Sequence, residues 1–377
     1  MKSSVISLVL NNFTNDSRVH KEAESLSVLN KDVTVVALHE DELEEFQSTK
    51  LYEIHRIKLT TRKWGRFKFI QLLKYIEFFI RFVWKYRKED TFHCHDLPAL
   101  PIGAFMKLIT FGKANVIYDT HEFAINDVPY ESKKRQKAKF YTERFFIKYA
   151  DKVITVSESI AKEYQALYGI KKPYLLLNCP KYNPEICQDN VFRSLFKLPE
   201  SSLIFLYQGA LTPGRGIEFL LKFFSENKNK DYVLVLMGYG SLEPLVKEYV
   251  LNSSNIHLKE AVPPQDILRF TSSADIGISF IQDSCLSYRY CLPNKMFEYL
   301  MSGVPVIVSN LPEMVGVIEK YSVGVTVKEN TNKSFNQAIR ALLSIDKDTL
   351  VANINNAKSN YCWEKQELVL KEIYENF

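Results

Sequence analysis

Residues 203–221, LIFLYQGALTPGRGIEFLL, decide the fold of the C-terminal half of the chain. The apolar run at their start predicts a strand that ends at Gly209, the Pro213–Gly214 pair predicts a turn, and the amphipathic run from Ile217 predicts a helix. A strand, a glycine-containing loop and a helix in this order are typical of a parallel α/β sheet.

The same alternation extends in both directions and forms two blocks. Predicted strands lie at 5–10, 33–38, 53–59, 91–94, 115–119, 152–156 and 174–177, and then at 203–207, 232–237, 256–258, 276–280, 306–308 and 323–325. Predicted helices lie at 18–29, 67–88, 98–110, 133–149 and 159–167, and then at 217–226, 242–251, 265–272, 295–301, 313–320 and 332–343. The stretch NCPKYNPEICQDN (178–190) separates the blocks and reads as a linker, because it contains two prolines and has no periodicity. We therefore predict two doubly wound α/β domains, with ligands bound beyond the strand ends in the cleft between them.

The composition agrees with two globular domains. The 377 residues exceed one ordinary domain of about 100–200 residues. The hydrophobic share of 46% excludes a disordered, collagen-like or coiled-coil chain. A net charge of +5 is too small to argue for a nucleic-acid partner. The six cysteines include no C-x-x-C pair, and the apolar run at 3–10 lacks a signal-peptide cleavage site, so we expect reduced thiols in a cytoplasmic protein.

The positive charge is concentrated in the N-terminal half. Residues 51–150 carry 20 Lys/Arg against 10 Asp/Glu. Such asymmetry indicates an anionic partner surface, either a membrane or a nucleic acid, or simply a solvated basic face. Of these, we favour an anionic membrane surface and expect the basic stretches RKWGRFK (62–68) and KKRQK (133–137) to contact it.

The predicted helix at 67–88 is amphipathic and rich in aromatic residues. We expect its apolar face to pack on the sheet as in an ordinary core helix. This face consists of Phe69, Leu72, Leu73, Ile76, Phe79, Ile80 and Val83. The charges within the helix exclude a transmembrane segment, because each mid-bilayer charge costs roughly 2.5–3.5 kcal/mol.

Polar residues follow the predicted strands of the N-terminal half. After the first strand, Asp16 is placed to cap a helix, whose N-terminus either binds an anion or is simply capped. After the fourth strand, His93 and His95 fall on one face, so with Asp96 they form a metal site, a ligand-contacting loop or a structural polar group. His121 directly follows the fifth strand, where it either contacts a substrate hydroxyl, transfers a proton or is structural.

Three segments of the C-terminal half are suited to a nucleotide. In the loop at 209–216, the glycines allow close backbone approach and Arg215 adds a cation, which suits a diphosphate; the alternative is a plain glycine-rich turn. Gly238 and Gly240, after the next strand, again allow close backbone approach to a ligand, but a lone G-x-G pattern is weak evidence for a binding site. Glu298 lies early in a helix, where a carboxylate either binds the diol of a ribose or stabilises the helix dipole.

Together these segments resemble the retaining glycosyltransferases of family 4, which have the GT-B fold of two Rossmann-like domains facing across a cleft. The resemblance covers nearly the whole chain and is carried by ADKVITVSESI (150–160), YQGALTPGRGIEFL (207–220), SSADIGISF (272–280) and LPNKMFEYLMSGVPVIVSN (292–310). It implies an acceptor-binding domain at 1–180 and a nucleotide-sugar-binding domain at 190–360. It also implies that the tail at about 361–377 packs back on the first domain.

The resemblance also implies site residues. The catalytic pair is His121 and Glu298, of which His121 contacts the donor sugar and Glu298 the ribose. The residues expected to bind the donor are Gly209, Arg215, Gly216, Gly238, Tyr239, Asn294, Lys295, Met296, Phe297 and Glu298. The residues expected near the acceptor are Asn12, Phe13, Asn15, Asp16, Arg18, His95, Asp96 and Glu122.

Further expectations concern the ligands and the location. The donor is UDP- or GDP-linked and the acceptor is a glycan or is lipid-linked. The D-x-D triplet of the chain, at 346–348, comes after the predicted helix at 332–343 and not at a strand end, so we do not take it as the signature of metal-dependent glycosyltransferases. No metal and no other cofactor are expected. The protein is expected at the inner face of the cytoplasmic membrane as a peripheral protein of cell-surface polysaccharide or glycoconjugate synthesis.

Two residues depart from the family pattern. Ala210 stands where the family often has an arginine, and Lys295 is a candidate replacement for that cation. Tyr290 stands where the first glutamate of the family's E-x7-E motif is expected, so the donor sugar does not carry over. These departures keep two alternatives open: a non-catalytic GT-B subunit, and a sugar-nucleotide 2-epimerase that uses carboxylates among Asp16, Asp96, Glu122 and Asp127.

Overall fold

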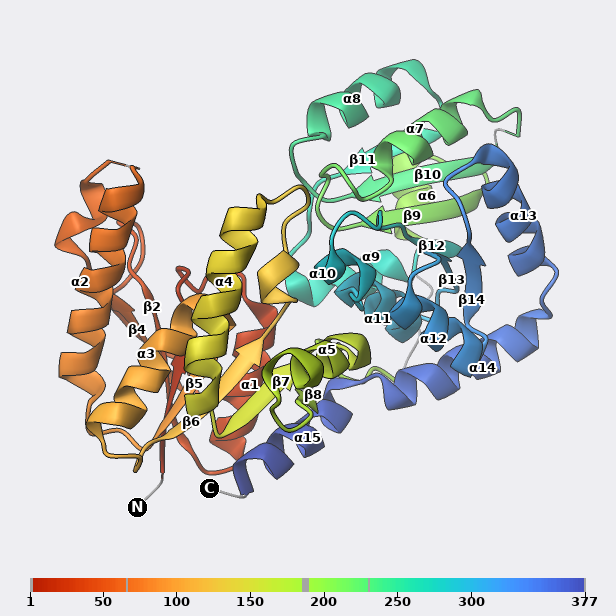
Figure 1. Ribbon diagram of the computed structural model, residues 1–377. Helices are drawn as coiled ribbons and strands as arrows, with labels where there is room; N and C mark the ends of the chain where they lie inside the picture. Colours follow the sequence, from red (N-terminus) through yellow and green to blue (C-terminus); the bar gives the residue numbers. More distant parts are fainter. Residues whose placement is uncertain (1–2, 66, 185–189, 230, 376–377) are drawn as a thin grey trace. The chain divides into compact units, whose positions relative to one another are not determined.

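The chain divides into two units, each built on its own sheet. In a computed structural model, unit 1 comprises Met1–Leu176 and Glu367–Phe377, and unit 2 comprises Leu177–Gln366 (Figure 1). The structure describes residues 3–65, 67–184, 190–229 and 231–375. Two α/β units with largely parallel sheets confirm the predicted fold class.

Unit 1 contains an eight-stranded sheet with the order β3-β4-β2-β1-β5-β6-β7-β8. Its strands are β1 (Ser4–Leu8), β2 (Asp32–Leu38), β3 (Phe46–Ser48), β4 (Glu53–Ile57), β5 (Thr91–His95), β6 (Asn115–Thr120), β7 (Lys152–Thr155) and β8 (Tyr174–Leu175). The pairs are parallel except β3 with β4. The strand order reverses between β1 and β5, and ligands of doubly wound sheets bind at such a switch point.

Helices cover both faces of the sheet of unit 1. They are α1 (Ser17–Val28), α2 (Lys68–Tyr86), α3 (Asp96–Ile109), α4 (Lys133–Phe146), α5 (Glu158–Tyr168) and the C-terminal part of α15 (Trp363–Glu375). Alternate strand residues face opposite layers. Val5 and Val33 pack with α1 and α15, whereas Ile6 and Phe92 pack with α2 and α3. The end of the chain therefore completes the core of unit 1.

Unit 2 contains a six-stranded parallel sheet with the order β11-β10-β9-β12-β13-β14. Its strands are β9 (Leu203–Gln208), β10 (Tyr232–Met237), β11 (Ile256–Lys259), β12 (Ile276–Ser279), β13 (Val306–Ser309) and β14 (Gly324–Val327). The order reverses between β9 and β12, so the loop that follows β9 lies at the switch point.

The helices of unit 2 also form two layers. They are α6 (Val191–Phe196), α7 (Ile217–Glu226), α8 (Glu243–Asn252), α9 (Ile267–Thr271), α10 (Leu286–Arg289), α11 (Asn294–Met301), α12 (Pro312–Tyr321), α13 (Asn332–Leu343) and α14 (Lys347–Asn360). On β9, Phe205 and Tyr207 pack in the core formed with α7 and α13. Ile204 and Leu206 point the other way, into the core formed with α11, α12 and α14.

The prediction for the helix at 67–88 is wrong in one respect. Of the predicted face, Phe79 and Val83 pack against the core, whereas Phe69, Leu72, Ile76 and Ile80 are exposed. The residues that α2 buries fully are Phe78, Phe82 and Tyr86. The reason is that α2 is apolar on two faces, and the sheet covers one of them. The other predicted helices lie where expected, whereas α6, α10, α14, α15 and the short strand β3 were not predicted.

Cysteines and membrane spans were also part of the predictions. Cys94, Cys179, Cys285, Cys291 and Cys362 are free thiols, and Cys187 lies outside the described residues. Among the helices in the described ranges, none combines the length and apolar character that crossing a bilayer requires.

Candidate active site

The first candidate site of unit 2 is the loop between β9 and α7. Gly209, Gly214 and Gly216 all have positive φ angles, of 113°, 83° and 72°. A Cβ on Gly216 would lie 2.7 Å from Cβ of Phe280, so only glycine lets the loop pass over β12 into α7. The loop therefore brings exposed backbone to the start of a ten-residue helix, where anions are favoured.

A second glycine loop, after β10, lies directly against the first. A Cβ on Gly238 would lie only 1.9 Å from the carbonyl oxygen of Gly209. The two backbones therefore approach in a way that no other residue allows. The neighbouring Tyr239 is largely exposed and is free of the core.

Arg215 gives this loop its charge. Its guanidinium stacks on the ring of Tyr288 at 4.4 Å from the ring centroid. Its Nε atom is buried and has no hydrogen-bond partner among the described residues. A fixed cation with an unused donor at a helix N-terminus is suited to a phosphate group.

Lys295 adds a second cation from the first turn of α11. Its Nζ atom lies 3.7 Å from the ring centroid of Tyr207, and a Cβ on Gly209 would be 3.6 Å from that Nζ. Burial and then Arg215 lower the pKa of Lys295 to about 7, in spite of the opposing effect of Glu298. A bound anion would reverse this shift, because it favours the charged ammonium.

Glu298 lies one turn further along α11. Its carboxylate accepts a hydrogen bond from Nε2 of Gln208, the last residue of β9, and Thr271 donates to Oε1 of the same glutamine. The bond orients Glu298 at the end of β9, beside the glycine loop. Two acceptor oxygens in this place suit a vicinal diol.

The remaining predicted donor residues of α11 differ in their exposure. Asn294 is exposed at the first position of the helix, whereas the side chains of Met296 and Phe297 are buried in the core. Only the backbone of these two residues can therefore face a ligand. Tyr290 follows α10, and Ala210 accepts a hydrogen bond from the hydroxyl of Tyr207 through its carbonyl oxygen.

In unit 1, His121 lies at the carboxyl end of β6. Its backbone N–H donates to Asp96 Oδ1 at 3.1 Å, and its Nε2 lies 3.4 Å from Asp119 Oδ2 and 3.1 Å from Nδ1 of His95. Burial alone would lower the pKa of His121, but the carboxylates of Asp96 and Asp119 outweigh it and raise that pKa to about 9. His121 is therefore a partly exposed cation at neutral pH. Asp96 has a left-handed φ of 62°, an unusual conformation for a non-glycine residue.

A buried polar cluster that includes Asp119 and Arg18 lies next to His121. Arg18 holds Asp119 with Nη2–Oδ1 and Nε–Oδ2 distances of 2.8 and 3.0 Å, and its Nη1 donates to the carbonyl oxygen of Leu176. Burial would raise the pKa of Asp119, but Arg18 and then His121 hold it well below the usual range. Arg18, predicted near the acceptor, is thus a buried partner of Asp119.

The same cluster brings together the side chains that the spacing of His93 and His95 suggested as metal ligands. Their rings stack at 4.4 Å, as expected for alternate residues of one strand. Ligand-type atoms of Glu22, His93, His95 and Asp119 all lie within 4.8 Å of one another. Arg18, however, lies 2.9 Å from Glu22 and also binds Asp119, so a guanidinium already supplies the positive charge there.

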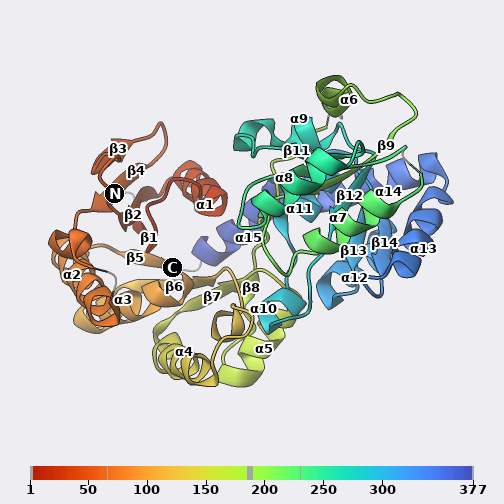
Figure 2. The ribbon, with the colours of Figure 1, turned by 90° about the horizontal axis from the view of Figure 1, so that it is seen from above.

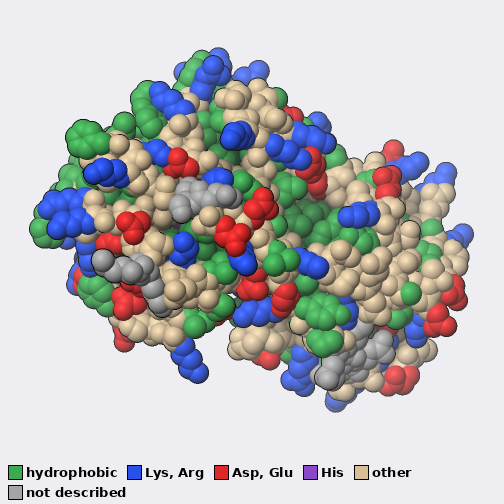
Figure 3. Space-filling view, turned by 90° about the horizontal axis from the view of Figure 1, so that it is seen from below, with side chains coloured by type: hydrophobic (Ala, Val, Ile, Leu, Met, Phe, Trp, Pro, Cys, Tyr) green, Lys and Arg blue, Asp and Glu red, His purple; other side chains and the backbone are tan. Residues whose placement is uncertain are grey.

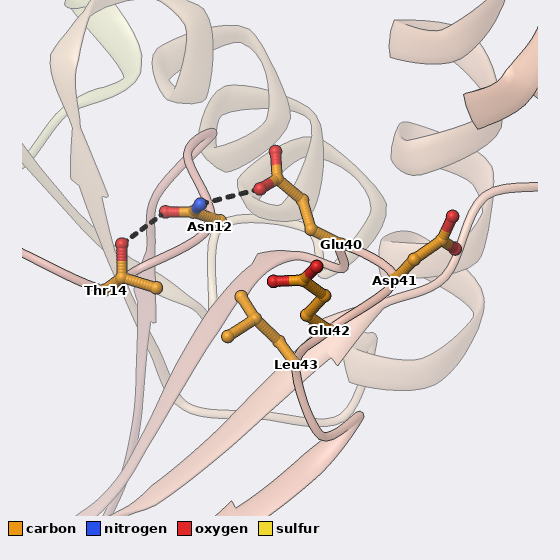
Figure 4. A pocket seen from close by; sticks show the side chains of 6 residues that line it. All are labelled: Asn12, Thr14, Glu40, Asp41, Glu42 and Leu43. Atoms are coloured by element: carbon orange, nitrogen blue, oxygen red, sulfur yellow. Dashed lines mark hydrogen bonds between the residues drawn. The ribbon is translucent and has the colours of Figure 1, made fainter.

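The first loop of unit 1 borders an open pocket of about 410 Å³, lined by Asn12, Thr14, Glu40, Asp41, Glu42 and Leu43 (Figure 4). Asn12 donates to Glu40 at 2.8 Å and accepts from Thr14 at 2.9 Å. Glu40 is paired with Arg62 and Asp41 with Lys63, at 2.5 and 3.4 Å. The pocket therefore offers mixed hydrogen-bonding groups, which suit hydroxyls.

The other residues predicted around the first loop have different positions. Phe13 is buried, and its ring stacks on His20. Asp16 accepts from the N–H of Val19 and so caps α1, and Asn15 and Glu122 are exposed. Of the predicted first-loop residues, Asn12 is the one that lines the pocket.

Two family matches divide the chain in the same way as the two units. Residues 17–177 match the family described as Glycosyltransferase Family 4, and residues 190–360 match the family described as Glycosyl transferases group 1. The chain is a GT-B glycosyltransferase.

Relatives of this glycosyltransferase agree with the assignment. It is 25% identical over 340 residues to the chitobiosyldiphosphodolichol beta-mannosyltransferase of Debaryomyces hansenii. The alignment covers 79% of this chain and 69% of that protein. Its fold is similar to sucrose-phosphate synthase from Thermosynechococcus elongatus, with a TM-score of 0.79, 16% identity and coverage of 100% of this chain and 99% of that one. It is also similar to Anabaena HepE in complex with UDP-glucose, with a TM-score of 0.76, 11% identity and coverage of 99% and 100%.

Sequence reasoning missed several partners in this glycosyltransferase. Glu22 and Asp119 were not predicted, and neither was Tyr374 of α15, whose hydroxyl lies 2.8 Å from Nδ1 of His93. A signal for the first two exists, because Arg18 and Glu22 are one helical turn apart and Asp119 and His121 alternate on one strand. Tyr374 is 281 residues from His93, and no local pattern connects them.

Proposed function

We propose that the chain transfers a sugar, with retention, from a UDP- or GDP-linked donor to a glycan or lipid-linked acceptor in the synthesis of a cell-surface polysaccharide or glycoconjugate. The observation that carries this proposal is the grouping of Arg215, Lys295 and Glu298 around the glycine loop that follows β9. Two cations and a helix N-terminus suit a diphosphate, and the carboxylate suits the adjoining ribose.

In the proposed reaction, the bond between the anomeric carbon and the diphosphate oxygen breaks. The acceptor oxygen forms the new bond to that carbon, its proton passes to the departing diphosphate, and nucleoside diphosphate is released. Negative charge grows on the leaving group, where Arg215 and Lys295 stabilise it. Lys295 is also proposed to replace the arginine that the family often has at the position of Ala210, since its ammonium lies beside Gly209.

His121 is the proposed contact to the donor sugar. As a cation, His121 carries a proton on both ring nitrogens. Its Nε2 faces Asp119 in the buried cluster, and its Nδ1, 3.7 Å from Asp96, is the N–H proposed to donate to a sugar hydroxyl. Retention is consistent with this charge state, since a protonated histidine cannot act as a general base.

The acceptor is proposed to be polyhydroxylated and joined to a lipid. The pocket of Asn12 and Glu40 offers hydrogen-bonding groups that suit hydroxyls. The name of the Debaryomyces hansenii relative describes a disaccharide on a diphosphodolichol, which is a lipid-linked acceptor. A peripheral position at the inner face of the cytoplasmic membrane follows from such an acceptor, and the predicted membrane contact of KKRQK (133–137) stays a prediction.

The experiment that tests this function supplies a panel of UDP- and GDP-sugars with lipid-linked glycan acceptors and follows the products by mass spectrometry and NMR. We expect one nucleotide sugar to give a glycosylated product with the anomeric configuration of the donor. Glu298→Ala should abolish transfer, while the control Glu319→Ala, an exposed residue of α12, should not.

Three results would contradict parts of the proposal. An inverted product would exclude retention and leave the transfer intact. Conversion of one nucleotide sugar into its 2-epimer, without an acceptor, would support the epimerase. Near-wild-type turnover by Glu298→Ala would show that the donor site lies elsewhere.

A further inference from the structure

Helix α2 of unit 1 exposes a continuous apolar stripe, the α2 outer face. It consists of Phe69, Leu72, Ile76, Ile80 and Trp84, which are between 42% and 74% exposed. Their spacing of three or four residues aligns them along one side of the helix. Apolar patches of this kind mark interaction sites.

The α2 outer face is not a misplaced core surface, because the core contact of α2 is on its other side. Phe78, which is buried, is two residues from both Ile76 and Ile80, and two residues correspond to 200° of rotation about a helix axis. Phe78, Phe82 and Tyr86 fill the core below. The outer face therefore points away from the core that these residues fill.

Helix α3 extends the apolar surface. The ring of Phe105 lies 4.9 Å from that of Phe79 on α2, and Tyr75 donates to the carbonyl oxygen of Pro98, so the two helices lie side by side (Figures 1 and 2). Leu108, in the last turn of α3, and Phe111, just after the helix, are exposed to 51% and 94%.

Cations surround this surface. Lys68 begins α2, and Arg87 and Lys88 follow its end; no ion pair of these three is found within the described part of the chain. Glu77, the one acid in α2, is bound to Arg81 and to the backbone of Thr60 and Thr61. Figure 3 shows blue side chains among green ones at the left end of the molecule, where α2 lies in Figure 1.

The loop before α2 is fixed against the helix. Nζ of Lys74 donates to the carbonyl oxygens of Trp64 and Gly65, at 3.0 and 3.3 Å. Trp64 is half exposed, so this bond keeps a second tryptophan beside the helix. Tryptophans with flanking cations are typical of surfaces that enter the headgroup region of a bilayer.

We propose that the α2 outer face, with the adjoining end of α3, inserts into the interfacial region of an anionic lipid bilayer. The proposal rests on the proposed function, because a lipid-linked acceptor is presented at such a surface. A second copy of the chain fits this face less well, since pairing two copies would bring the cations of both copies together.

The test is sedimentation of the full chain with vesicles of phosphatidylglycerol and phosphatidylcholine, compared with phosphatidylcholine alone. We expect binding to the anionic vesicles, weakened by salt, with a blue shift of the fluorescence of Trp84 and Trp64. Ile76→Ser/Ile80→Ser should reduce the partition coefficient at least tenfold. The matched control is Leu251→Ser/Leu343→Ser, at exposed leucines of unit 2, and it should bind as the wild type does.

A donor titration of the same variants separates this proposal from the proposed function. If the wild type binds a nucleotide sugar but no vesicles, the membrane face is refuted and the glycosyltransfer stands. If it binds vesicles but no nucleotide sugar, the proposed donor site fails. If Ile76→Ser/Ile80→Ser turns a dimer into a monomer in sedimentation velocity, the occupant is a second copy and the proposal is overturned.

Discussion

At the scale of single residues, the site depends on two cations whose pKa values move in opposite directions. Lys295 is poised to lose its proton near neutrality, whereas His121 keeps its proton to about pH 9. Burial disfavours the charge in both cases. The difference is that His121 has two carboxylates beside it and Lys295 has Arg215.

The state of Lys295 predicts proton uptake on donor binding. Its pKa of about 7 in the free protein should rise when a diphosphate binds, because the anion favours the charged form. Proton uptake on binding should therefore rise from about half a proton at pH 7 toward one proton near pH 8, and affinity should fall as the pH rises. Titration calorimetry in buffers of different ionisation enthalpy measures this uptake.

Lys295→Arg serves as the control for that measurement. Arginine stays charged throughout this range, so the variant should bind the donor without proton uptake. Equal uptake in Lys295→Arg and the wild type would assign the proton to another group.

The state of His121 predicts an alkaline limit to activity. With its pKa raised to about 9, His121 is almost fully protonated at neutral pH and loses its charge as the pH rises through about 9. The rate kcat/KM should fall above pH 9. Asp96→Asn removes one of the two carboxylates and should move this limit down by roughly one pH unit.

Asp32→Asn, at the exposed start of β2, is the control for the pH profile. It should leave the alkaline limit in place. An unchanged limit in Asp96→Asn would show that His121 does not set it.

The sequence predicted residues at strand ends better than it predicted their partners. His121, Arg215 and Glu298 each follow a recognisable strand or open a helix, and the structure places them there. The pairing of Arg18 with Asp119 spans 101 residues, and a single sequence does not show it. The position of the Arg18 guanidinium beside the histidine cluster likewise results from tertiary packing, which a single sequence does not show.

At the scale of elements, the donor site depends on two loops whose backbones touch. Gly238→Ala should push the loops apart, since its Cβ would lie 1.9 Å from the carbonyl oxygen of Gly209. We expect loss of donor binding and a loss of stability clearly above the 1–2 kcal/mol or so of a left-handed conformation alone. Urea unfolding and donor titration measure the two effects.

Gly112→Ala provides a matched comparison. Gly112 also has a positive φ, of 81°, but no atom lies within 4 Å of its Cβ position. This variant should lose about 1 kcal/mol and bind the donor normally. Equal behaviour of the two variants would mean that the contact between the loops is unimportant.

Periodic elements were predicted well, and weakly patterned ones were not. β9 and α7 have strong apolar periodicity, and both lie as predicted. β3 is a three-residue, fully exposed strand, and α14 has few buried residues, so neither has a clear pattern. For α2, periodicity predicted the helix and the packing of Phe79 and Val83 on the core, but not the exposure of Ile76 and Ile80.

At the scale of the whole molecule, the two units have the same architecture but carry different chemistry. Unit 1 holds the buried histidine cluster and the α2 outer face, and unit 2 holds the glycine loops. The shared cleft that the sequence led us to expect stays a prediction.

Catalysis by the whole enzyme is predicted to be independent of metal ions. Arg215 and Lys295 supply charge for the leaving group, and Arg18 supplies it in the histidine cluster. Transfer should therefore persist after dialysis against a chelator and should not rise when Mg²⁺, Mn²⁺ or Zn²⁺ is added. Loss on chelation and recovery with one metal would instead assign Glu22, His93, His95 and Asp119 as its ligands.

The most direct test of the account is a calorimetric titration of the full chain with UDP- and GDP-sugars, repeated with Arg215→Ala. We predict that one nucleotide sugar binds at one site per chain. Loss of the charged contacts, at about 1.5–3 kcal/mol each, should weaken binding by roughly 10- to 100-fold or more in the variant. Binding by Arg215→Ala with wild-type affinity, or no binding of any nucleotide sugar by the wild type, would contradict the proposed donor site.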